Sequence, residues 1–83
     1  MLLPLYSFVR GDTLGVLVLV QDSCRVRELG EVAQQVSSVR VAVTGVARVV
    51  FRNVTLDPDA ILADVGLEPL DRIDVIPGAP DVL

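Results

Sequence analysis

The stretch LPLYSFVRGDTLGVLVLV, residues 3–20, has the pattern of a β-hairpin. Two apolar runs, residues 3–10 and 14–20, flank the turn-forming pair Gly11-Asp12. Valine and leucine carry the second run, and the β-branching of valine favours strands over helices. Apolar runs on either side of a Gly-Asp pair are typical of a β-hairpin, so this stretch predicts two antiparallel strands.

A helix of about three turns is predicted directly after the hairpin. Asp22 and Ser23 are its candidate N-cap residues, because their side chains accept hydrogen bonds from a first helical turn. Five apolar residues then recur at helical spacing and form one stripe: Val26, Leu29, Val32, Ala33 and Val36. Gly30 lies among them and costs about 1 kcal/mol relative to alanine, so this helix depends on tertiary packing.

The second half of the chain predicts two more strands, a short helix and a last strand. Residues 48–52 and 54–56 have strand character, and residues 72–76 form the last strand, followed by a flexible tail over residues 77–83. Asp57 is predicted to cap the short helix, with Pro58 at its first position and Gly66 closing it in a left-handed conformation. Residues 37–47 mix strand-like and loop-like features, and the sequence leaves their structure open.

This order of elements predicts an α+β fold of the β-grasp (ubiquitin-like) type. A hairpin is followed by a helix that crosses the sheet, and the last strand returns parallel to the first, which gives a mixed sheet of four to five strands. The 83 residues leave room for one domain, 1–83, with one core. Any function must therefore fit a single small surface.

The charge pattern excludes several classes of partner. All seven basic residues are arginine, and eleven acidic residues leave a net charge of −4, so no nucleic-acid or anionic membrane partner is expected. The longest apolar run is far shorter than the roughly 20 residues of a membrane span. A single cysteine and the lack of a signal-peptide pattern favour the cytoplasm.

Two stretches resemble a known family. The sequence LDPDAILADVGLEPLDRIDV, residues 56–75, resembles the C-terminal half of the small ubiquitin-like subunit of toluene-4-monooxygenase-type hydroxylases. Residues 3–5 and 12–20 resemble the opening hairpin of that subunit. The turn closed by Gly-Leu and followed by Asp-x-Ile-x-Val is common to β-grasp domains in general. The Leu-Pro opening, the Gly-Leu-x-Pro phrase and the chain length point to the monooxygenase subunit, whereas residues 37–47 are shorter and less charged than that family suggests.

The resemblance implies a non-catalytic γ (B) subunit of a bacterial multicomponent diiron monooxygenase that hydroxylates aromatic or alkene substrates. In that family the subunit binds the hydroxylase subunit that holds the diiron centre, while separate ferredoxin, reductase and effector proteins complete the system. The implied partners are therefore the larger hydroxylase subunits. No cofactor and no small-molecule substrate is expected in this chain.

Candidate chemistry within the chain is sparse. A carboxylate-bridged diiron site needs Glu-x-x-His pairs, and the sequence has no histidine. Cys24 near a helix start suggests a nucleophile, but no histidine is present to activate it, which favours a packing role. The acidic spacing from Asp57 to Glu68 suggests a calcium loop, yet Leu62 stands where such a loop needs glycine. We therefore predict no catalytic, cofactor-binding or metal-binding residues.

Strand parity predicts a docking surface on the sheet face away from the helix. The valines of the second strand face the helix, and the opposite face carries apolar residues where a solvated sheet normally places polar ones. The predicted interface residues are Tyr6, Phe8, Leu17, Leu19, Val50 and Ile76. Such a face is a partner interface or an aggregation liability, unless residues 37–47 cover it or its apolar residues are merely scattered.

Two other functions remain as alternatives. A ubiquitin-like sulfur carrier or protein modifier acts through a C-terminal Gly-Gly, whereas this chain ends Asp81-Val82-Leu83, so that role would require proteolytic trimming. A free-standing bacterial ubiquitin-like adaptor of a secretion system is not distinguished from the monooxygenase subunit by sequence. The sequence indicates neither the hydrocarbon oxidised nor the stoichiometry.

Overall fold

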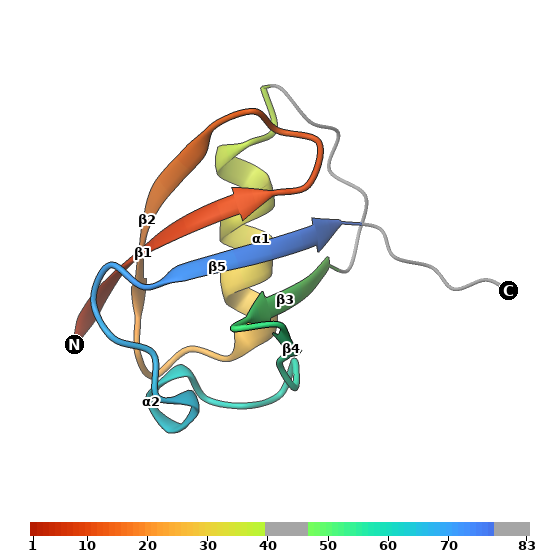
Figure 1. Cartoon of the computed structure of the whole chain (residues 1–83). Helices are drawn as coiled ribbons and strands as arrows, with labels where there is room; N and C mark the ends of the chain where they lie inside the picture. The colour runs from red at the N-terminus through yellow and green to blue at the C-terminus, as the bar shows by residue number, and fades with distance from the viewer. Residues whose placement is uncertain (40–46, 78–83) are drawn as a thin grey trace, which may run out of the picture.

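The computed structural model describes residues 1–39 and 47–77, which form a five-stranded mixed sheet with one main helix across a single face (Figure 1). The strand order is β2-β1-β5-β3-β4. The elements are β1 (Leu2–Val9), β2 (Gly15–Gln21), α1 (Val26–Val36), β3 (Ala47–Phe51), β4 (Val54–Thr55), α2 (Leu62–Val65) and β5 (Arg72–Pro77). This arrangement confirms the predicted β-grasp fold.

The central pair of strands, β1 and β5, is parallel, as the predicted crossover requires. The other strand pairs are antiparallel. Pro4 lies inside β1 although proline lacks an N–H group, but pairing with β5 starts only at Tyr6, opposite Arg72. The carbonyl of Pro4 accepts a hydrogen bond from the N–H of Leu70 at 2.7 Å, in the turn that leads into β5.

The core lies between α1 and the inner face of the sheet. Its buried apolar residues come from β1, β2, α1, β3, α2 and β5, and they are Leu3, Leu5, Val9, Val18, Val20, Val26, Leu29, Ala33, Val49, Leu62, Ile73 and Val75. Ser7 of β1 is a polar residue within this otherwise apolar core. It is also buried, and within the described residues its hydroxyl has no hydrogen-bond partner.

Helix α1 differs from the prediction at its start and in its buried face. Arg25, rather than Asp22 or Ser23, is the N-cap, and the carboxylate of Glu28 accepts a hydrogen bond from the Arg25 backbone N–H at 2.8 Å. Gly30 is buried, and a Cβ atom built on it would lie 3.4 Å from Val49 Cγ2. Because the helix approaches β3 this closely, its small residues Gly30 and Ala33 face the sheet. Two predicted members of the apolar stripe therefore lie at the exposed surface, Val32 and Val36.

The short helix also begins later than predicted. Ile61 is its N-cap, whereas the Asp57 carboxylate accepts a hydrogen bond from the Asp59 N–H at 2.9 Å and closes a turn before the helix. Gly66 ends α2 with φ +89°, as predicted. Residues 40–46 and 78–83 lie outside the described residues, and so do most of the open segment 37–47 and of the predicted tail 77–83.

Candidate docking surface

The outer face of the sheet, opposite α1, carries the predicted interface residues. Along β1 and β2 burial alternates, so that Leu5 and Val18 face the core while Tyr6, Leu17 and Leu19 point outward. Tyr6 is directly opposite Leu17 in the β1–β2 ladder. The exposed fractions of the side chains are 44% for Tyr6, 48% for Leu17 and 57% for Leu19, so each has surface that a partner can bury.

These three residues and Leu2 form what we call the apolar cluster: Leu2, Tyr6, Leu17 and Leu19. Pro4 lies between them, directly opposite Leu19. Leu70, which donates its N–H to Pro4, is exposed next to this group and has a left-handed backbone with φ +68°. Parity along β1 already places Leu2 on this face, whereas nothing in the sequence places Leu70 there.

Phe8 is on the same face, but its ring is engaged within the chain. Gly15 lies opposite Phe8, and a Cβ atom at Gly15 would come within 2.5 Å of the ring, so the ring covers the glycine. Arg72 belongs to β5, the strand on the other side of β1. Its guanidinium lies 4.1 Å from the centroid of the Phe8 ring, within the range of a cation–π contact. Phe8 is therefore half-buried, and it offers a partner less free surface than Tyr6 does.

Val50 and Ile76 are outward-facing and half-buried, on β3 and β5. Asp74 is opposite Val50 on one side and Phe8 on the other, and its carboxylate pairs with the Arg72 guanidinium at 3.0 Å. This charged pair on β5 lies between Val50 and the apolar cluster. The six predicted residues thus share one face, but they form two groups rather than one continuous apolar surface.

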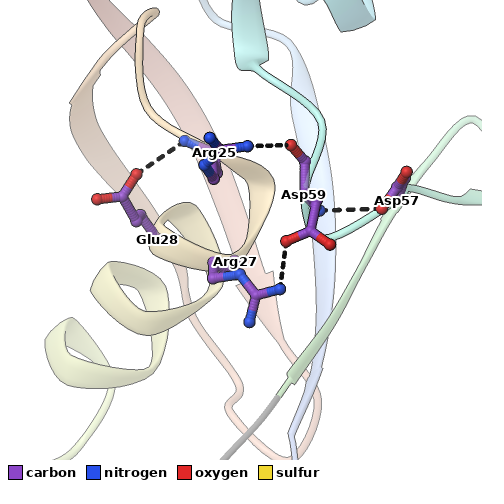
Figure 2. Close-up of polar contacts among 5 residues, drawn as sticks. All are labelled: Arg25, Arg27, Glu28, Asp57 and Asp59. Carbon is purple, nitrogen blue, oxygen red and sulfur yellow. Dashed lines mark hydrogen bonds and ion pairs between the residues drawn. The ribbon is translucent and has the colours of Figure 1, made fainter.

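A separate group of polar contacts joins the start of α1 to the segment before α2 (Figure 2). The Arg25 guanidinium donates to the Asp59 carbonyl at 2.8 Å, and Arg27 forms an ion pair with the Asp59 carboxylate. The Arg27 guanidinium also donates a hydrogen bond to that carboxylate, and this bond together with the negative charge of Asp59 raises the pKa of Arg27 above its usual value. These contacts fasten the segment before α2 to the start of α1. Asp57 and Asp59 thus have structural partners, and the alternative of a calcium loop is not needed to explain them.

The described residues offer little for chemistry. Among them, no three His, Cys, Asp or Glu side chains gather as a metal site would require. Cys24 is half-buried and packs against the core. A depression of about 320 Å³ beside Phe8, Arg10, Arg72 and Ile76 is shallow and open, unlike the enclosed apolar pockets that hold small ligands. None of the described helices has the length and apolar character to cross a membrane.

Fold and surface together define the class: a ubiquitin-like β-grasp domain with an apolar cluster on its open sheet face. No protein-family model matches the sequence, and no curated protein matches it. Among solved structures, the chain is similar to ubiquitin of Caldiarchaeum subterraneum, with 13% identity, a TM-score of 0.74 and coverage of 99% of this chain and 98% of that one. It is also similar to the ubiquitin-like domain of Plasmodium falciparum Dsk2, with 16% identity, a TM-score of 0.72 and coverage of 92% and 97%.

The particular resemblance is to a monooxygenase component. The chain is similar to a chain in the structure of the toluene 4-monooxygenase HD complex with the inhibitor 4-bromobenzoate. The TM-score is 0.82 and the identity 25%, over 92% of this chain and 98% of that one. This finding confirms the resemblance stated from the sequence.

Proposed function

We propose that this chain is a non-catalytic accessory subunit of a multicomponent diiron monooxygenase. In this role it docks onto the hydroxylase subunit that holds the diiron centre and supports the hydroxylation of an aromatic or alkene substrate. The observation that carries the proposal is the similarity to a chain of the toluene 4-monooxygenase complex. Its TM-score of 0.82 and identity of 25% exceed the 0.74 and 13% found for the archaeal ubiquitin.

The composition of the chain supports an accessory role. The sequence has no histidine, so the nitrogen ligands of a diiron site must come from another chain. Asp57 and Asp59, two of the residues that could suggest a cation site, are engaged in the turn before α2 and in the ion pair with Arg27. The metal and the substrate then belong to the partner, and this chain contributes a surface.

The apolar cluster is the best docking surface for such a partner. Tyr6, Leu17 and Leu19 lie side by side and are each about half exposed. Strands β1 and β2 carry no charged residue, and the nearest charge on this face is Arg72 of β5, which is paired with Tyr6. Aromatic and aliphatic anchors of this kind dominate the energetics of protein interfaces. Val50 and Ile76 lie beyond the Arg72–Asp74 pair, and we place them at the rim.

The proposal is tested by recovering the affinity-tagged chain from its native source and identifying what comes with it by mass spectrometry. We expect the subunits of a hydroxylase with Glu-x-x-His motifs, in a fixed ratio to this chain. Recovery with components of a secretion system would identify a free-standing adaptor instead. Covalent attachment of the chain to other proteins would identify a modifier, and either result would overturn the proposal.

A further inference from the structure

Strand β2 forms one margin of the sheet, and its outer edge is open. Within the described residues only β1 pairs with it (Figure 1). Natural proteins protect such edges with charged residues, proline, bulges or very short strands. At the opposite margin β4 has two residues, but β2 has seven, GVLVLVQ, with no charge and no proline. This edge therefore offers a row of backbone groups without the usual protection.

The hydrogen bonds of the hairpin fix which backbone groups face outward. The Asp22 N–H donates to the Met1 carbonyl at 3.0 Å, so this pair of opposite residues is hydrogen-bonded. Opposite pairs alternate between bonded and non-bonded in an antiparallel ladder. The bonded pairs that follow are therefore Leu3–Val20, Leu5–Val18 and Ser7–Val16.

The hydrogen bonds that β1 makes on its other side, toward β5, agree with this alternation. The Tyr6 N–H donates to the Asp71 carbonyl at 2.9 Å, away from β2. Tyr6 and Leu17 are thus a non-bonded pair, and the N–H and C=O groups of Leu17 and Leu19 point to the open edge. The residues that present these backbone groups also present their side chains on the outer face, within the apolar cluster.

We infer that the β2 edge takes up an extended segment of the partner protein as a sixth strand of the sheet. Residues of that strand that pair with Leu17 and Leu19 must project their side chains on the same outer face, since directly paired residues share a face. The segment that fits is uncharged and carries an apolar residue at every second position. This inference rests on the proposed function, because it assigns the strand to the hydroxylase.

A second copy of this chain fits the edge less well. Two β2 strands pairing with each other would join the two apolar clusters into one larger exposed surface. A strand that belongs to a larger protein can pair with β2 while the body of that protein covers Tyr6 and Leu17. The combination of an open edge and an apolar cluster beside it therefore favours a partner segment over a dimer.

The test is amide hydrogen exchange in the isolated chain and in its complex with the hydroxylase. We expect the Leu17 and Leu19 amides to exchange freely in the isolated chain and to slow at least about ten-fold in the complex. Leu17→Pro removes one outward N–H without removing a bond to β1, because proline is tolerated where the N–H points away from the ladder. It should weaken binding about ten-fold more than Leu17→Ala, which keeps that donor.

A probe without the hydroxylase separates this inference from the proposed function. The probe is a synthetic peptide of alternating valine and threonine, and its matched control carries N-methyl groups at every second residue. We expect the probe, and not the control, to shift the NMR signals of the Leu17 and Leu19 amides.

If the probe binds but no hydroxylase is captured, the β2 edge accepts an added strand, while the assignment of that strand to the hydroxylase fails together with the proposed function. If the hydroxylase binds while both amides still exchange freely, the edge inference is overturned and the proposed function stands. The edge inference is also overturned if neither the hydroxylase nor the peptide probe affects the Leu17 and Leu19 amides, or if these amides are protected in a dimer of this chain.

Discussion

Replacing Leu19 with aspartate should weaken docking about 100-fold without unfolding the chain. Leu19 is 57% exposed, and burial of a whole leucine side chain is worth about 1.5–3 kcal/mol, so a partner gains about 1–2 kcal/mol from the exposed part. A carboxylate at this position would also have to lose water in the interface, at a cost of at least about 2 kcal/mol. The sum of about 3 kcal/mol corresponds to a Kd raised about 100-fold. In the free chain the same carboxylate stays hydrated.

The measurement is calorimetric titration of the hydroxylase with wild type and variant, together with urea unfolding of each free chain. Val54→Asp is the matched control, because Val54 is 60% exposed and lies on β4 at the opposite margin of the sheet. We expect the control to bind with the wild-type Kd. A folded Leu19→Asp chain that also binds with the wild-type Kd would refute the placement of the interface on the apolar cluster.

Three further predictions concern the fold itself. Gly66→Ala should lower the free energy of unfolding by about 1–2 kcal/mol through backbone strain alone, because φ is +89° and a Cβ atom would meet nothing within 4 Å. Gly66→Asn should have a smaller effect, and equal Tm values for Gly66→Ala and wild type would contradict this. Gly30→Ala should stabilise by up to about 1 kcal/mol, raising Tm by about 4–8 °C, because the new methyl group meets Val49 at an ordinary contact distance; a lower Tm would show that the helix cannot accept it. Ser7→Ala should leave urea unfolding unchanged or shift it to higher urea, because the buried hydroxyl has no partner among the described residues, and a clear loss of stability would indicate a hidden one.

Local patterns in the sequence predict most of the fold, because the elements obey short-range rules. The Gly11-Asp12 turn, the alternation along β2 and the left-handed Gly66 each depend on a few neighbouring residues, and all three agree with the structure. The rotation of α1 does not follow from such rules. It depends on how closely the helix packs on β3 at Gly30, which is a contact between residues far apart in the sequence.

On the docking surface too, short-range patterns predict which residues face outward but not the contacts between distant residues. Strand parity correctly places Tyr6, Leu17 and Leu19 on the outer face. It could not show that Phe8 is held over Gly15 by Arg72, because that contact joins three strands. It also could not find Leu70, whose place beside Pro4 depends on the turn before β5.

As an accessory subunit, this chain should hold no metal of its own. The most direct test is iron analysis of two samples, the complex recovered through the tagged chain and the isolated chain purified alone. We expect stoichiometric iron in the complex, bound to the hydroxylase component, and none in the isolated chain. Iron in the isolated chain, or a complex that contains no iron-binding hydroxylase, would contradict it.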